Sequence, residues 1–279
     1  MIASKLFARI VILAMLLIPS LLPAQETGVQ LYTFRAQLAK DLPGTLKLIR
    51  DMGITKLEGG GTYGLPRDQY KKLLDENGLS IVSWGADFDK LANDPAQFIA
   101  DAKYFGAKYI VCFWIPHKDT TFTIDDAAKA VGVFNTAGKL LKENGLSLCY
   151  HPHGYEFRPH ESGTLFDYMV KNINPDFCNF EMDVFWVKHP GQDPVALFKK
   201  YPKRFPLLHL KDRAPGTPGN QAGEVDVESN IVLGKGDVGI AEIVSVAKKS
   251  KVKYFFIEDE SSRSVEQVPE SLIFLKTIK

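Results

Sequence analysis

The strongest constraint on the fold is an alternation, repeated eight times along the chain, of a short apolar run and a longer amphipathic segment. The apolar runs occupy residues 28–34, 56–60, 79–87, 109–115, 146–153, 178–187, 205–212 and 254–260. Near-continuous apolar runs of this length are typical of parallel strands buried on both faces. The intervening segments, such as 67–78 and 123–145, end in glycine, which is a common residue at the C-terminus of a helix.

Eight strand–helix units in about 250 residues predict one domain, a closed (β/α)8 TIM barrel of the α/β class. A doubly wound open sheet is the alternative. No GxGxxG sequence follows the first run, which argues against a dinucleotide site there. The glycine- and proline-rich segment over 213–237 follows the seventh run, and we expect it to cover the site as a lid or rim loop.

Residues 1–24 have the features of a secretory signal peptide. Lys5 and Arg9 precede an apolar run over 10–22, which is short for a membrane span of about 20 residues. We therefore expect residues 25–279 to form the mature barrel domain in the periplasm or outside the cell, with no membrane attachment after cleavage. The sequence leaves the oligomeric state open.

The charge and cysteine content exclude two other classes of protein. A formal net charge of +1 gives no overall field to attract nucleic acid. Three scattered cysteines, all in apolar runs, form no disulfide framework, and we interpret them as small buried residues.

Polar residues gather at the carboxyl ends of the predicted strands, where a barrel of this kind builds its active site. Taken run by run from the second to the eighth, the polar and tryptophan residues at these ends are Glu58; Trp84 and Asp87; Trp114 and His117; His151, His153 and Glu156; Glu181, Asp183 and Trp186; His209, Lys211 and Asp212; and Glu258 and Glu260. Ionisable residues in apolar strands are costly unless paired or ligated. An aspartate, a glutamate and one or two histidines on successive strands suit one divalent ion, Mn²⁺, Zn²⁺, Co²⁺ or Mg²⁺.

The stretch YHPHGYEF over 150–157 places two histidines two residues apart. In an extended chain, residues i and i+2 point the same way, so His151 and His153 face one site together. They suit either metal binding or a pair of hydrogen-bonding side chains in a pocket.

The mature chain from Val29 onward resembles the xylose isomerase-like TIM barrels, in the sugar phosphate isomerase/epimerase branch. The resemblance rests on GVQLYTFR, YHPHGYEF, MDVFWV, HLKD and IEDE at strands one, five, six, seven and eight. It implies one divalent metal held by residues of strands five to eight, which here are His151, Asp183, His209 and Glu258. Many members have glutamate on strand five, so His151, His153 or Glu156 can fill that place.

The same resemblance, together with the position of each residue at a strand end, suggests further roles. The expected catalytic residues are Glu156, His153 and Lys211, and the expected substrate contacts are Glu58, His117 and Trp186. Lys211 lies two residues after His209, on the same side of its strand, where it can stabilise an enediolate or hold a substrate oxygen.

The resemblance implies a small-molecule carbohydrate substrate and an isomerase or epimerase that works through an enediolate. Export and the lack of a phosphate-binding loop favour an unphosphorylated sugar or keto-sugar. One alternative is a lyase, by β-elimination, or hydrolase-like action on a 3-keto-glycoside. Another is a non-catalytic, exported carbohydrate-binding barrel. A multi-zinc nuclease would need more histidines and a basic face.

Overall fold

Eight parallel strands close into a barrel in the computed structural model, which describes residues 25–278; the signal peptide expected over 1–24 lies outside them. The strands follow one another around the barrel in the order β1-β12-β9-β8-β5-β4-β3-β2. They are β1 (Glu26–Gln30), β2 (Lys56–Gly59), β3 (Ser80–Ala86), β4 (Tyr109–Cys112), β5 (Ser147–Tyr150), β8 (Cys178–Asp183), β9 (Leu207–Leu210) and β12 (Tyr254–Ile257). The predicted single-domain (β/α)8 barrel is confirmed.

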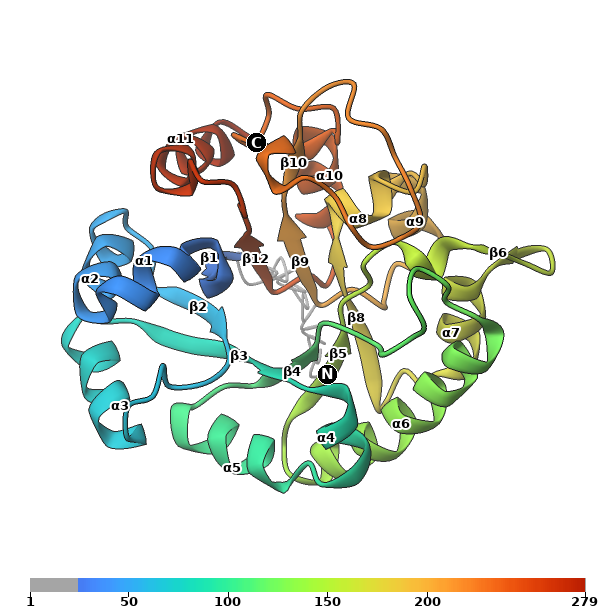
Figure 1. Cartoon of the computed structure of the whole chain (residues 1–279), viewed down its shortest axis with the longest axis horizontal. Coiled ribbons are helices and arrows are strands. Elements are labelled where there is room, and N and C mark those ends of the chain that lie inside the picture. The colour runs from blue at the N-terminus through green and yellow to red at the C-terminus, as the bar shows by residue number, and fades with distance from the viewer. Residues whose placement is uncertain (1–24, 279) are drawn as a thin grey trace, which may run out of the picture.

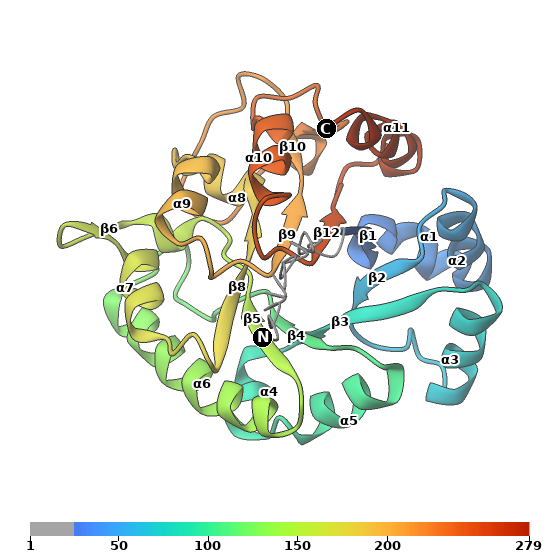
Figure 2. The same cartoon turned by 180° about the vertical axis from the view of Figure 1, so that it is seen from behind.

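Helices surround the strands on all sides (Figure 1), and the view from behind shows the same ring (Figure 2). They are α1 (Arg35–Lys40), α2 (Leu42–Asp51), α3 (Arg67–Glu76), α4 (Phe88–Asn93), α5 (Ala96–Phe105), α6 (Ile124–Glu143), α7 (Leu165–Asn172), α8 (Val184–Lys188), α9 (Pro194–Lys200), α10 (Ile240–Ala247) and α11 (Ser264–Thr277). Short 3₁₀ helices span Leu31–Phe34, Tyr155–Phe157 and Val227–Ser229. None of the helices within residues 25–278 is long and apolar enough to cross a membrane.

Two of the apolar runs end as helices because a side chain caps the backbone. In the run 178–187 the carboxylate of Asp183 accepts the N–H groups of Phe185 and Trp186, at 2.7 and 3.0 Å, and so begins α8. In the run 28–34 the side-chain oxygen of Gln30 accepts the N–H of Tyr32 and begins a 3₁₀ helix. The apolar run alone therefore does not mark the end of the strand.

The barrel interior is filled at mid-height by an apolar layer. It consists of Val82, Val111, Cys149, Leu207 and Phe256, each at most 8% exposed. The helices cover the outside of the strands with the larger core that runs around the barrel. All three cysteines are buried as free thiols, as expected for small core residues.

The segment over 213–237 is fastened at its base and reaches the carboxyl ends of the strands at its tip. β10 (Asp212–Arg213) pairs with β11 (Asn230–Ile231), and the guanidinium of Arg213 forms a two-point ion pair with Asp237. The carboxylate of Asp212 accepts backbone N–H groups of the segment at residues 213, 234, 236 and 238. The tip at Gly223 packs against Trp114 and Tyr155.

Candidate active site

A polar layer follows the apolar layer because side chains on one face of a strand recur every second residue. Cys149 is followed on the same face by His151, Leu207 by His209, and Phe256 by Glu258. We use polar layer for the six buried residues Glu58, His151, Glu181, Asp183, His209 and Glu258, none more than 8% exposed. The register between β2 and β3 shifts next to Glu58, because Leu57 pairs with Ile81 but Glu58 pairs with Ser83. The extra residue of this bulge is Val82 of β3.

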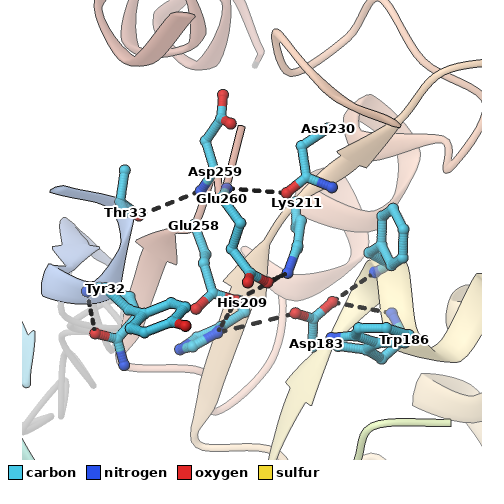
Figure 3. A network of polar contacts seen from close by, with 12 residues as sticks. Tyr32, Thr33, Asp183, Trp186, His209, Lys211, Asn230, Glu258, Asp259 and Glu260 are labelled. Atoms are coloured by element: carbon cyan, nitrogen blue, oxygen red, sulfur yellow. Dashed lines mark hydrogen bonds and ion pairs between the residues drawn. The ribbon is translucent and has the colours of Figure 1, made fainter. Parts of the chain in front are cut away.

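Three side chains of the polar layer, His151, Asp183 and His209, converge on one point at the carboxyl ends of β5, β8 and β9. Glu258, after β12, adjoins this point through its contact with His209. Oδ2 of Asp183 lies 3.8 Å from Nε2 of His151 and 3.9 Å from Nδ1 of His209. Nδ1 of His209 lies 3.3 Å from Oε2 of Glu258. Figure 3 shows Asp183, His209 and Glu258 turned toward one another. These are the four residues expected as metal ligands, and the fold brings them together.

The atoms at this point fit a divalent ion. Nε2 of His151 and Oδ2 of Asp183 are buried, have no hydrogen-bond partner and lie together with a nitrogen of His209 as a possible ligand set. Metal–ligand bonds of about 2.0–2.2 Å to nitrogen and oxygen place neighbouring ligand atoms roughly 3–4 Å apart. The other oxygen of Asp183 is used as the helix cap, so the strand-to-helix turn fixes the direction of the free one.

The remaining ring nitrogens of both histidines contact carboxyl groups. Nδ1 of His151 lies 3.2 Å from Oε2 of Glu181, and Nε2 of His209 lies 3.3 Å from the same oxygen. Nε2 of His209 also hydrogen-bonds to Glu58. A carboxylate behind a metal-binding histidine fixes the ring and raises its basicity. Glu58, expected to contact substrate, is instead placed behind His209.

Burial and crowding shift the acidity of these groups in opposite directions. Burial, aided by Glu58, raises the pKa of Glu181, and burial raises the pKa of Asp183 to about 6. Burial would lower the pKa of His209, but the neighbouring carboxylates Glu181, Glu58 and Glu258 outweigh it and raise that pKa. Buried carboxyl groups therefore outnumber the positive charges near them, and a divalent cation would offset this excess.

Lys211 is a fully buried ammonium group above the candidate ligands. Its Nζ lies 3.3 Å from Oε2 of Glu258 and also binds Glu260, and it sits 5.5 Å from the ring centre of Trp186. Burial alone would raise the pKa of Glu258, but Lys211 and then His209 overcome it and hold that pKa well below its usual range. Lys211 thus keeps Glu258 as a carboxylate.

A cavity of about 950 Å³ opens at the carboxyl ends of the strands, beside the polar layer. His151, His153, Trp186, Glu258 and Glu260 are among the residues that line it. Of the expected catalytic and substrate-binding residues, His153 and Trp186 therefore reach the cavity, whereas Lys211 reaches it through its two glutamate partners.

His153 is the cavity residue with the clearest capacity to carry a proton. Its ring centre lies 4.7 Å from that of His151 and 5.5 Å from that of Trp186. Burial, and then the charge of Lys211, lower the pKa of His153 to about 4, so its imidazole is neutral near pH 7. Its Nδ1 is buried and has no hydrogen-bond partner, which leaves Nε2 as the ring nitrogen that can reach the cavity.

Glu156 and His117 lie away from the cavity. The carboxylate of Glu156 accepts the hydroxyl of Tyr150 and the backbone N–H groups of His153 and Gly154, the last at 2.9 Å, and it is fully buried. Nδ1 of His117 lies 2.7 Å from the carbonyl oxygen of Ile115. Both residues therefore support the loops that carry His153 and Trp114.

Sequence reasoning gave no role to three groups that the site uses. Glu181 was noted only as a strand-end residue, although its place two residues before Asp183 on β8 puts it on the same inner face. Glu260 lies two residues after Glu258 and lines the cavity. The aromatic residues Tyr32 and Tyr63 also line it. Tyr32 belongs to the first apolar run but lies in the 3₁₀ helix that ends it, and Tyr63 lies in a turn after β2.

Comparison with known proteins gives relatives of one kind. An inosose dehydratase of Klebsiella pneumoniae is 26% identical over 186 residues, which cover 58% of this chain and 61% of that protein. An inosose dehydratase of Bacillus cereus is 23% identical over 234 residues, 74% of this chain and 77% of that protein. The chain thus spans about three fifths of the length of the Klebsiella relative.

Solved structures show the same fold over most of the chain. A sugar phosphate isomerase/epimerase from Parabacteroides distasonis superposes with a TM-score of 0.76 at 24% identity, covering 93% of this chain and 98% of that one. The IolI protein with a bound zinc atom has a TM-score of 0.67 at 15% identity, covering 90% and 94%. The model of one protein family matches residues 46–278. The chain belongs to the xylose isomerase-like TIM barrel family.

Proposed function

We propose that this protein is a divalent-metal-dependent lyase that removes the proton beside the carbonyl group of a keto-sugar and expels an oxygen from the next carbon. The observation that carries this proposal is His153, which lines the cavity and whose lowered pKa of about 4 leaves its imidazole neutral near pH 7. The nearby carboxyl groups already have hydrogen-bond partners: Glu156 accepts the backbone N–H of Gly154, and Glu260 accepts a hydrogen bond from Lys211.

His151, Asp183, His209 and Glu258 would hold the ion. A divalent ion at that point supplies Lewis acidity, which draws electron density from a bound carbonyl oxygen and acidifies the adjacent C–H group. The chain supplies what keeps the four ligands in place: Glu181 and Glu58 behind the histidines, Lys211 beside Glu258, and the helix cap at Asp183.

His153 can then act as base and acid in turn. Its Nε2, the ring nitrogen that is not buried, takes the proton from the carbon beside the carbonyl, and the electron pair of that C–H bond forms an enolate. The carbonyl reforms, a C=C bond forms to the next carbon, and the C–O bond there breaks with its electron pair. The imidazolium of His153 returns its proton to the departing oxygen, which leaves as water or an alcohol. One proton carrier is enough for this sequence, whereas epimerisation needs a carrier on each face of the sugar.

The lining of the cavity favours a neutral sugar. Among the described lining residues, Arg35 is the only arginine or lysine, against the carboxyl groups of Asp87, Glu224, Glu258 and Glu260. A phosphate group would meet this excess of negative charge without an arginine cluster to bind it. The relatives named inosose dehydratases support the reaction class, because their name denotes the loss of water.

An isomerase or epimerase is the second candidate. The observation in its favour is that Glu260, a second carboxyl group, lines the same cavity as His153. Similar structures named sugar phosphate isomerase/epimerase, one of them 26% identical with a TM-score of 0.71, point the same way. On this alternative Glu260 would exchange its contact with Lys211 for the substrate proton.

The test is to load the purified protein with Mn²⁺, Zn²⁺, Co²⁺ or Mg²⁺ and add keto-sugars and 3-keto-glycosides in D₂O, followed by ¹H NMR. A lyase gives loss of the proton beside the carbonyl together with a new vinylic signal. His153→Gln should lower that rate by about 10²–10⁴-fold, whereas His160→Gln, at a histidine that lines a different surface pocket, should not. Inversion without a vinylic product supports the epimerase instead, and an unchanged rate in His153→Gln overturns the assigned role.

A further inference from the structure

Three exposed aromatic side chains surround the mouth of the cavity. Tyr32 is 52% exposed, Tyr63 41% and Trp114 42%, and all three line the cavity. The other large apolar side chains that are exposed in residues 25–278, such as Tyr104 and Ile273, lie elsewhere. Aromatic rings gathered at one opening mark a binding surface more often than they serve the fold.

The neighbours of Trp114 hold its ring in place. Trp114 stacks on His117, with ring centres 5.0 Å apart and planes inclined by 29°, and meets Tyr155 edge-on at 5.0 Å. Nδ1 of His117 is in turn fixed to the carbonyl of Ile115, and the hydroxyl of Tyr155 accepts the N–H of the same residue. The ring is therefore supported from behind while two fifths of its surface stays open.

The two tyrosines come from the loops after β1 and β2. The guanidinium of Arg35 lies 4.5 Å from the ring centre of Tyr32. Tyr63 has a φ of +54°, a left-handed conformation that is uncommon for a residue other than glycine. Such strain is kept where the surrounding structure needs the side chain in one position.

The cavity is larger than one sugar ring requires. At about 950 Å³ it lies at the upper end of the range of about 300–1,000 Å³ that is usual for sites of drug-sized ligands. It extends from His151 and Glu258, deep in the barrel, to the aromatic mouth and the tip of the 213–237 segment. Glycines at 59, 60 and 85 line one wall, so no side chain divides this space.

We infer that the cavity takes a carbohydrate of at least two sugar rings, with the second ring stacked at the aromatic mouth. The reacting ring is placed beside His153 and Glu258, and to that extent the inference rests on the proposed function. One face of a pyranose ring carries mostly C–H groups, which suit the open face of Trp114 or a tyrosine. Asp87, Glu224 and Arg35 line the same cavity and can bind the hydroxyl groups at the ring edge.

These polar groups favour a sugar over an apolar aglycone as the outer unit. A flat apolar group would cover the aromatic rings but would bury the charged groups beside them without hydrogen bonds. A glycosyl unit satisfies both kinds of neighbour. The substrate class is accordingly a disaccharide or longer glycoside that carries the keto group on the ring at the metal end.

Binding alone tests this inference. Isothermal titration of the metal-loaded protein compares maltose, cellobiose and trehalose with methyl α- and β-glucoside and with phenyl β-glucoside. We expect at least one disaccharide to bind about tenfold more tightly than both methyl glucosides, and Trp114→Ala to remove that advantage. Tyr104→Ala, which removes an aromatic ring of similar exposure away from the cavity, should leave it unchanged.

The contrary results are equally definite. Disaccharides that bind no better than the methyl glucosides, or not at all, overturn the inference, and so does a preference confined to phenyl glucoside. A disaccharide advantage that survives in Trp114→Ala, in Tyr32→Ala and in Tyr63→Ala overturns it as well. Because no turnover is measured, the outcome is independent of the lyase test, and either proposal can fail while the other stands.

Discussion

The apolar layer and the polar layer of this barrel share three strands, β5, β9 and β12, on which an apolar residue is followed two positions later by a polar one. The lower layer, with Cys149, Leu207 and Phe256, fills the interior with apolar groups. The upper one, with His151, His209 and Glu258, fills it with groups that titrate. The same backbone thus carries one layer that stabilises the fold and one that costs free energy.

The difference shows where the stability of the protein comes from. Burying apolar side chains contributes roughly 25 cal/mol per Å² removed from water. Burying ionisable groups is unfavourable unless each is paired, and Glu58, Glu181 and Asp183 all keep an oxygen without a hydrogen-bond partner. The apolar layer and the outer core therefore maintain the barrel, and the polar layer is retained for what it binds.

The largest effect is expected from Asp183→Asn, which changes one charge in the polar layer. The amide oxygen can still cap α8, so the fold is kept, but the free oxygen at the ligand point becomes a neutral group. Bound metal should fall to a small fraction, and turnover should fall about a thousandfold or more. Metal analysis and the NMR assay measure both.

A matched control exists for this change. Asp193 caps α9 with the same geometry, accepting the N–H groups of Val195 and Ala196, but lies outside the polar layer. Asp193→Asn should therefore keep its metal and its activity. Full metal occupancy in Asp183→Asn would show that the ligand set has been assigned to the wrong residue.

The apolar layer is probed by Phe256→Ala. Removing a fully buried ring should lower the free energy of unfolding by about 3–5 kcal/mol, because the rigid barrel cannot close the space. Metal stoichiometry in the folded protein should stay near one, since Glu258 and its neighbours are unchanged. Urea denaturation gives the first quantity and metal analysis the second. A loss of stability below about 1 kcal/mol would mean that the layer is not the support we describe.

Glu156 extends the comparison to a buried carboxyl group outside both layers. Burial raises its pKa to about 7, above the usual 4.5, so the folded state holds a proton that the unfolded chain releases first. The free energy of unfolding should therefore decrease as the pH rises from about 4.5 to 7, by up to about 3 kcal/mol from this group. Glu156→Gln should flatten the profile over this range, whereas the exposed Glu143→Gln should leave it as it is. Parallel profiles for wild type and Glu156→Gln would refute the shift.

Glu156 also shows what sequence could and could not foresee. The barrel and the polar residues at its strand ends follow from two periodicities, the strand–helix repeat and the alternation along each strand. The choice of the four candidate ligands among those residues came from the resemblance to a known family. Glu156 lies beyond the strand, where Gly154 has a φ of +98° and turns the chain so that the carboxylate meets Tyr150. Glu58 was expected at the substrate, but it lies inside the barrel beside the bulge in β3, against His209. Loop conformations and bulges depend on contacts between distant segments, which no local pattern records.

The smallest effect is expected from substituting Glu58 or Glu181, the two carboxyl groups of the polar layer that contact the histidine rings. These substitutions are also the sharpest test of that layer. Glu58 and Glu181 lie close together beside His209, and burial, aided by Glu58, raises the pKa of Glu181. Glutamine resembles a protonated carboxyl group, so Glu181→Gln should lower metal affinity by less than about tenfold, and Glu58→Gln by about 10–100-fold. Competition with a chelator at pH 7 measures both constants. The reverse order would show that Glu181, which lies within 3.3 Å of both rings, is the carboxylate that supports His151 and His209.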